Sequence, residues 1–519
     1  MDRLALPDWF ERDLFVYPPL DRREGTSTDD IRGAWRSAFE ERTAPLGLYV
    51  HIPAELACVP QPDLPGGTHP YLRCLQHEAQ RLIPAGEAPF ANVYIGGGSR
   101  GALTTLPAEA IDALLTWLHD RFDLSASDQF TAEIDALLVD QEKAALLKRH
   151  GVNRITTRLP LLEDERDRLA FARGVRRCRK AGIRAIDVDL KGPWKDRAAL
   201  EADAALVAKL KPDSVNLPFG ISPPEKDGPP VKNTQLCQMR ELRGAILGLG
   251  SHAVSYAGRR LVYAKAGGFF LYVRTCLRGG ALRYTGGPVS QAQAMRGRLI
   301  AGLGEDGYVD REAFREAFAS YPEEAFPEIF DALLRKGMLI REGARLKISA
   351  ADKAGRLTCA AALFEEKFLP TDSAAPVETG ATTPAQAPQE LMDAAIAAYG
   401  SGDAAAALRK LDECLRAAPG DPNALMTRSA VHAGMKDPGS ARSDIDAVIT
   451  PLEKRLAAGG EPWESGASLP ARRLLADALS SRAGLRPAAE ARADIELALL
   501  TAPADWPRAG ECAAQLCAS

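Results

Sequence analysis

Short runs of β-branched and aromatic residues alternate with amphipathic stretches from about residue 46 onwards. An apolar run bounded by turn residues is typical of a buried strand, and apolar positions three or four residues apart are typical of a helix. Helices are therefore predicted at 107–122 and 138–151, the second ended by Gly151 as a C-terminal cap. The predicted strands are 46–52, 92–97, 129–135, 153–158, 185–190 and 213–218.

Repeated strand–helix units with right-handed crossovers form a parallel sheet that curves toward a barrel. The predicted fold class is α/β, a partial (β/α) TIM-type barrel with a small winged-helix-like cap, followed by an all-α helical repeat domain. Functional side chains of such a barrel lie at the carboxyl ends of its strands. The predicted parts are 1–45, an N-terminal capping segment; 46–288, the barrel; 289–368, the helical cap; 369–388, a flexible linker; 389–505, helical repeats; and 506–519, a tail.

The helical region after the linker is repetitive. Small and apolar residues recur with an offset of 34 residues, which is the tetratricopeptide period. A weaker third unit is formed by Ala491, Ile495 and Pro503. Such repeats build a ridge that presents a concave surface to another protein. The matched positions are Gly402 with Lys436, Asp403 with Asp437, Ala407 with Ala441, and Leu411 with Ile445.

Charge and composition exclude several classes of partner. The chain has 65 basic and 69 acidic residues and a formal charge of -4, which gives no electrostatic reason to expect nucleic acid or an anionic membrane as a partner. No apolar run approaches the roughly 20 residues of a membrane span, and no secretory signal is recognised. The nine cysteines contain no C-x-x-C pair, so reduced thiols are expected. A cytoplasmic location is predicted.

Six sequence blocks follow one another along the predicted barrel: LYVHIP, VYIGGGS, TAEIDA, GVNRITTR, IDVDL and GLGSHAVSY. In order and rough spacing they resemble the radical S-adenosylmethionine (SAM) superfamily. They are most similar to its branch of oxygen-independent coproporphyrinogen III oxidases, haem chaperones and anaerobic haem-degrading enzymes. The resemblance covers about residues 46–365 and implies a radical SAM-like barrel with a cap of the coproporphyrinogen oxidase type.

The resemblance also indicates what this chain lacks. In the family, three cysteines spaced C-x-x-x-C-x-x-C follow the first strand and hold a [4Fe-4S] cluster. Aligned from His51, those positions are Glu55, Val59 and Pro62, and Cys58 is one residue out of register. One carboxylate beside a valine and a proline does not make a site for a soft metal cluster. No [4Fe-4S] cluster or other metal is therefore expected.

The cofactor-binding half of the family's site is partly retained. Gly96–Ser99 resemble the segment that approaches the methionine end of SAM, and Tyr49 corresponds to an aromatic beside the adenine. The three glycines also have a structural interpretation, as a tight turn. Glu133 and Asp189 have one as strand-end carboxylates satisfied by backbone N–H groups. Pro160 replaces a ligand-binding glutamine, and Val254 replaces a histidine, with His252 displaced by two residues. The candidate cofactor-binding residues are Tyr49, Gly96, Gly97, Gly98, Ser99, Glu133 and Asp189.

These features predict a catalytically degenerate homologue, a pseudoenzyme that acts as a binding or scaffold protein. The tetratricopeptide-like repeats would recruit a protein partner, such as an active radical SAM relative. No catalytic residue and no bound cofactor are predicted, because radical chemistry needs an electron delivered through the cluster. Three alternatives stay open. They are a haem- or tetrapyrrole-handling protein, a SAM-binding enzyme with activity of the oxygen-independent coproporphyrinogen oxidase type, and a radical enzyme with unconventional cluster ligands.

Overall fold

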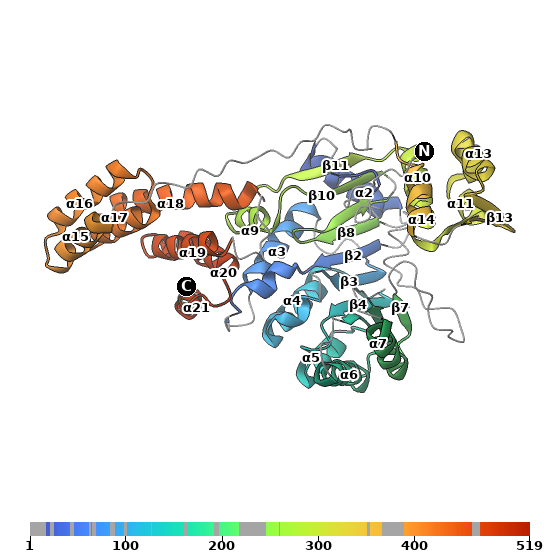
Figure 1. Ribbon diagram of the computed structural model, residues 1–519, viewed down its shortest axis with the longest axis horizontal. Helices are drawn as coiled ribbons and strands as arrows, with labels where there is room; N and C mark the ends of the chain where they lie inside the picture. The colour runs from blue at the N-terminus through green and yellow to red at the C-terminus, as the bar shows by residue number, and fades with distance from the viewer. Residues whose placement is uncertain are drawn as a thin grey trace. The chain divides into compact units, whose positions relative to one another are not determined.

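The computed structural model of the chain (Figure 1) forms two compact units. The first contains Met1–Ala54, Glu78–Ala266 and Leu282–Asp372, and the second contains Glu55–His77, Gly267–Ala281 and Ser373–Ser519. The described residues are 17–20, 25–41, 46–61, 64, 69–83, 89–97, 101–125, 127–159, 165–190, 197–216, 245–258, 260–349, 353–365, 389–458 and 468–518. The predicted linker, 369–388, lies outside them.

An 11-stranded mixed sheet is the centre of the first unit, in the order β1-β11-β10-β9-β8-β2-β3-β4-β5-β6-β7. Strands β2 to β8 are parallel to their neighbours, and β9, β10, β11 and β1 are antiparallel. The parallel strands are β2 (Leu46–His51), β3 (Asn92–Gly96), β4 (Gln129–Ile134), β5 (Arg154–Leu159), β6 (Ala185–Leu190), β7 (Ser214–Asn216) and β8 (Ala245–Leu249). The others are β9 (Val254–Ala257), β10 (Leu261–Lys265), β11 (Tyr284–Pro288) and β1 (Gly25–Thr26).

The two faces of the parallel strands differ in polarity, because successive side chains of a strand point to opposite faces. One face is apolar and buried, and each fully buried Val, Leu or Ile side chain contributes about 1.5–3 kcal/mol. The other face carries polar side chains, which form the candidate site. The apolar face includes Leu48, Val50, Val93, Ile95, Ile155, Ile186 and Val188.

Helices connect the parallel strands, as the sequence predicts. Asp140 caps α5, accepting a hydrogen bond from the backbone N–H of Lys143 at 2.8 Å. Gly151 follows the end of α5 at a φ of 85°, which confirms its predicted role as a cap. The helices are α2 (Thr28–Glu41), α3 (Pro70–Leu82), α4 (Ala108–Arg121), α5 (Gln141–Arg149), α6 (Glu165–Lys180) and α7 (Arg197–Leu210), with short helices η1 (Ala54–Cys58) and η3 (Leu103–Thr105).

The segment before the first parallel strand is part of the first unit. Trp35 of α2 is 1% exposed, and its indole N–H donates to the hydroxyl of Tyr263 at 2.7 Å. Tyr17 is also buried, and its hydroxyl donates to Glu365 at 3.2 Å. The aromatic residues of the described part of this segment are therefore packed into a core.

Helices and a small sheet follow the large sheet in the chain. The order of the small sheet is β12-β14-β13, with antiparallel pairing throughout. Its hairpin, β13 with β14, follows the helices α11, α12 and α13. The elements are α10 (Gln291–Ala301), η4 (Gly302–Asp306), β12 (Tyr308–Asp310), α11 (Arg311–Phe318), α12 (Pro322–Ala325), α13 (Pro327–Arg335), β13 (Leu339–Glu342), β14 (Arg345–Ile348) and α14 (Lys353–Ala361).

The second unit is helical and brings three separated chain segments together. Its C-terminal helices pack in consecutive pairs, α15 with α16, α17 with α18, and α19 with α20. None of the described helices of the chain combines the length and apolar composition needed to cross a bilayer. The helices are α9 (Phe269–Leu277), the start of α3, and α15 (Gln389–Gly400), α16 (Ala404–Ala417), α17 (Pro422–Gly434), α18 (Pro438–Ala458), α19 (Leu469–Ala483), α20 (Ala488–Thr501) and α21 (Ala509–Ala518).

The predicted strands agree with the observed ones to within two residues at each end. Strands β8 to β11 and helix α9, between residues 219 and 288, are not predicted by the sequence pattern. These strands have four or five residues each, and the glycines between them obscure the alternation. The fold class is confirmed as a mixed α/β sheet with a large helical portion, in which β7 and β1 are the outermost strands.

Candidate functional site

The candidate site is a row of polar side chains on one face of the parallel strands. Tyr49 pairs with Tyr94 across β2 and β3, and Glu133 pairs with Thr156 across β4 and β5. Thr156 in turn pairs with Asp187, two residues before Asp189. Because Tyr94 also pairs with Thr131, two residues before Glu133, the strand register places all of them on one face. Three predicted cofactor-binding residues, Tyr49, Glu133 and Asp189, are therefore brought to the same face.

Two tyrosines occupy the centre of this row. The rings of Tyr49 and Tyr94 are 5.9 Å apart between centroids. Burial, with the nearby negative charge of Glu133, raises the pKa of both phenols above the usual range. Both hydroxyls therefore stay protonated at neutral pH and can donate hydrogen bonds.

The turn after β3 is tied to Glu133. The backbone N–H of Gly97 donates to Glu133 Oε2 at 3.0 Å. Gly97 has a φ of 115°, and an added Cβ would lie 2.7 Å from His51 and from the carbonyl oxygen of Ile52. Only glycine fits at this position. The hydrogen bond is the structural role considered for Glu133 from the sequence. Gly98 and Ser99, two other predicted site residues, lie outside the described residues.

His51, at the end of β2, is held as a neutral imidazole. The hydroxyl of Tyr49 lies 2.7 Å from His51 Nδ1, and the rings of His51 and His252 are 5.5 Å apart. Burial lowers the pKa of His51 to about 3, and the charges of His252 and Lys265 act in the same direction. This geometry is that of a buried, hydrogen-bonded histidine.

A buried ion pair between Lys265 and Glu78 supports the Gly-Leu-Gly-Ser segment, residues 248–251. No sequence pattern indicates this pair. Lys265 Nζ lies 2.8 Å from Glu78, and both side chains are 1% exposed or less. Glu78 accepts a hydrogen bond from the backbone N–H of Gly250 at 2.8 Å, and Lys265 donates to the carbonyl of Gly248 at 2.7 Å. The pair therefore positions the turn between β8 and β9.

The segment after β2 does not fit an iron–sulfur cluster. It belongs to the second unit, where Leu56 is fully buried and Val59 is 2% exposed. The amide of Gln61 donates to the carbonyl of Leu56 at 2.6 Å. Val59 presents only hydrocarbon at a position where the family has a thiolate, and the carboxylate of Glu55 is a hard ligand. Pro62, at the third family position, lies outside the described residues.

No set of three histidine, cysteine, aspartate or glutamate side chains in the described part of the chain is arranged to hold a metal ion. The backbone of the segment after β2 is hydrogen-bonded to the C-terminal helices of the same chain. The carbonyl of Cys58 accepts a hydrogen bond from Arg472 at 2.9 Å, within the second unit.

Comparison with known proteins identifies distant relatives. No protein-family profile matches the chain. It is 27% identical over 207 residues to the haem chaperone HemW of Escherichia coli, covering 35% of this chain and 54% of that protein. It is 26% identical over 229 residues to an anaerobic coproporphyrinogen III oxidase of Cereibacter sphaeroides, covering 40% of this chain and 49% of the oxidase.

The matched regions thus span about half the length of these relatives. A structural match is the Escherichia coli coproporphyrinogen III oxidase HemN, described as a radical SAM enzyme, with a TM-score of 0.48 and 16% identity over 69% of this chain and 99% of that one. The sequence matches confirm the predicted similarity to haem-chaperone and anaerobic coproporphyrinogen oxidase proteins.

Proposed function

We propose that this protein is a catalytically degenerate relative of these proteins that works by binding rather than by radical chemistry. The observation that carries the proposal is the segment after β2. Its described residues offer a buried valine and one carboxylate where the family supplies thiolates. Without the cluster, no electron reaches the sulfonium of SAM, and no side chain can replace that step.

The C-terminal helices support a role in protein binding. Residues 34 apart have equivalent positions: Gly402 and Lys436 both have positive φ, at 88° and 60°, directly after helices α15 and α17. The small or apolar side chains Ala407 and Ala441, with the corresponding Leu411 and Ile445, are buried. Tetratricopeptide-like repeats of this kind bind other proteins. The partner proposed is a protein, and an active radical SAM relative is the first to test.

The proposal is tested by iron and sulfide analysis of full-length protein purified and reconstituted without oxygen. We expect folded protein without stoichiometric iron and without a cluster absorption band. A control relative with the three cysteines must take up its cluster under the same conditions. Near-stoichiometric iron and sulfide, lost on replacing Cys58 and Glu55, would overturn the proposal and assign these two residues as ligands.

A second candidate function is binding of SAM or a similar nucleoside without redox chemistry. The row of Tyr49, Tyr94, Glu133 and Asp189, next to the close turn at Gly97, favours it. It predicts measurable affinity for SAM by calorimetry that Glu133→Ala abolishes. Equal affinity in the variant would exclude this row as the binding site.

Haem handling is the third candidate, since one relative is named as a haem chaperone. The adjacent imidazoles of His51 and His252, 5.5 Å apart, are the observation that favours it. It predicts a Soret band on addition of haem that His252→Ala removes. A Soret band that survives replacement of both histidines would argue against this site.

A further inference from the structure

The C-terminal helices contain several buried carboxylates, and two of them, Glu453 and Glu496, pair with arginines from distant parts of the chain. Glu453 of α18 is 6% exposed, and Glu496 of α20 is 1% exposed. Burial of a carboxylate is costly unless a cation and hydrogen bonds compensate it. The partners of these two residues therefore show what the helices are built to contact.

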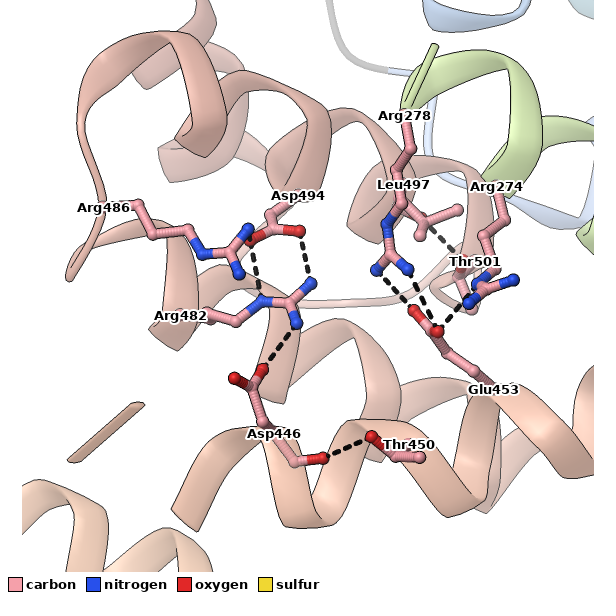
Figure 2. Close-up of polar contacts among 10 residues, drawn as sticks. All are labelled: Arg274, Arg278, Asp446, Thr450, Glu453, Arg482, Arg486, Asp494, Leu497 and Thr501. Atoms are coloured by element: carbon pink, nitrogen blue, oxygen red, sulfur yellow. Dashed lines mark hydrogen bonds and ion pairs between the residues drawn. The ribbon is translucent and has the colours of Figure 1, made fainter. Parts of the chain in front are cut away.

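The partners of Glu453 lie on α9, far away in the sequence. Arg274 Nε lies 2.7 Å from Glu453 Oε2, and Arg278 Nη2 lies 2.5 Å from Glu453 Oε1. Figure 2 shows the two guanidinium groups converging on this one carboxylate. Because the arginines are four residues apart, they project from the same side of α9. The last turn of α9 and its C-cap residue thus supply two guanidinium groups to one carboxylate.

Glu496 has a partner in the segment that follows β2. Arg73, in the first turn of α3, forms an ion pair with it, and Arg492 of its own helix lies 3.1 Å away. The two earlier segments of the second unit, 55–77 and 267–281, therefore each supply an arginine to a buried glutamate.

Arg472 of α19 also contacts the segment after β2. Here the arginine is on the C-terminal helix and the acceptor is in the segment. Its side chain is fully buried, and it donates to the carbonyls of Thr501 at 2.9 Å and Ala502 at 3.0 Å, at the C-terminal end of α20. A cation is favourable at this end of a helix. The third acceptor is the carbonyl of Cys58, at 2.9 Å.

The burial of α20 gives an independent argument. All residues from Asp494 to Thr501 are buried, so every side of these two turns is covered. A surface helix of a repeat array would leave one side in water. Helix α19 packs against α20, and α9 packs against it as well.

We infer that α18, α19 and α20 form a clamp in cis, whose ligand is this chain's own helix α9 together with the short helix η1 and the start of α3. The clamp holds by non-covalent contacts and does not depend on the peptide connection through residues 373–388. A foreign helix that used the same surface has to present two arginines one turn apart and displace α9. This inference goes beyond the proposed function, since it concerns how the chain binds itself.

The experiment uses the full chain with a protease recognition sequence inserted between residues 378 and 386. After cleavage, we expect both fragments to elute together from a sizing column at micromolar concentration. Glu453→Arg is expected to weaken this association by about 100-fold. Glu490→Arg is the matched control, because it makes the same charge change on α20 at a side chain that is 60% exposed.

The combined variant Glu453→Arg, Arg274→Glu and Arg278→Glu separates loss of contact from loss of folding, since reversing both sides should restore co-elution. Should Glu453→Arg not fold, Glu453→Gln is measured instead, with an expected weakening of about tenfold. Separation of the unsubstituted fragments on cleavage would overturn the inference. Equal affinity of the Glu453 and Glu490 variants would also overturn it. Iron content is unaffected in either case, so this test is independent of the one for the proposed function.

Discussion

The turn after β3 and the segment after β2 follow neighbouring parallel strands, yet they are stabilised in different ways. The turn after β3 is local: the backbone N–H of Gly97 donates to Glu133 of β4, the next strand in the chain, 36 residues away. The segment after β2 depends on Arg472, which is 414 residues away. The turn after β3 is thus fixed by a neighbouring strand of the first unit, whereas the segment after β2 is fixed by the C-terminal helices of the second unit.

The largest effect is expected from breaking the second region. Arg472→Met leaves the carbonyls of Cys58, Thr501 and Ala502 without their donor, and each buried acceptor that loses its partner is costly. We expect the free energy of unfolding of the full chain to fall by about 3–5 kcal/mol. Denaturant titration measures it.

The neighbouring Arg473 is the control for that prediction. It pairs with Asp505 at 2.8 Å, with side chains 47% and 77% exposed. Arg473→Met is therefore expected to cost no more than about 1 kcal/mol. Similar losses for both variants would show that Arg472 has no special role in the segment after β2.

A smaller effect is expected from breaking the first region. Gly97→Ala combines an unfavourable φ with a Cβ only 2.7 Å from the carbonyl oxygen of Ile52. The expected loss of unfolding free energy is about 2–4 kcal/mol. Gly151→Ala is the control, because its φ of 85° is also unfavourable but no atom lies within 4 Å of the new Cβ. It should lower the free energy of unfolding by only about 1 kcal/mol. Equal losses for both variants, measured by thermal unfolding, would mean that the turn after β3 yields without penalty.

His51, at the end of β2, makes the stability of the chain depend on pH, and acid titration measures this dependence. The folded chain holds His51 neutral down to about pH 3, whereas the unfolded chain binds a proton there near pH 6.5. Stability from His51 is thus present above pH 6.5 and is lost as the pH falls toward 3, with a slope of up to about 1.4 kcal/mol per pH unit. Burial also lowers the pKa of His69, to about 4, so two histidines contribute.

His51→Gln should therefore reduce the slope of unfolding free energy against pH between pH 6 and 4 by about half, a total of about 1–2 kcal/mol. His69→Gln is the matched variant and should remove the other part of the slope. An unchanged slope in His51→Gln would show that this imidazole is protonated in the folded chain.

The parallel strands and their helices could be predicted from the sequence because their signals are local. Leu48 and Val50 alternate with Tyr49 and His51, and this period of two defines both the strand and its polar side. The same alternation brought Glu133 and Asp189 to one face. Family resemblance added which of these residues to examine, and it predicted the absence of thiolates at Glu55 and Val59.

The contacts of the second unit could not be predicted, because nothing local distinguishes their residues. Arg472 and Arg473 are adjacent in one helix, and one is fully buried while the other is 47% exposed at its side chain. Glu453 and Glu496 likewise read as ordinary helix carboxylates. Burial of such a charge is decided by a partner elsewhere in the chain, and a sequence pattern does not contain that information. The interpretation of these helices as a separate repeat region therefore omitted the segments 55–77 and 267–281 with which they form a unit.

The hydrogen bond between Arg472 and Cys58 also has a consequence for synthesis of the protein. A chain grows at about 5–20 residues per second, so Cys58 leaves the ribosome about 20–80 seconds before the arginine that will bind it. Throughout that interval the apolar side chains of Leu56 and Val59 lack the C-terminal helices that complete their unit. The strands from β2 to β8 can pair while translation continues, but residues 55–77 reach their final environment only after the last helices are made. A chain whose translation stops early would therefore expose this segment, which makes it the natural point of attack for chaperones and proteases.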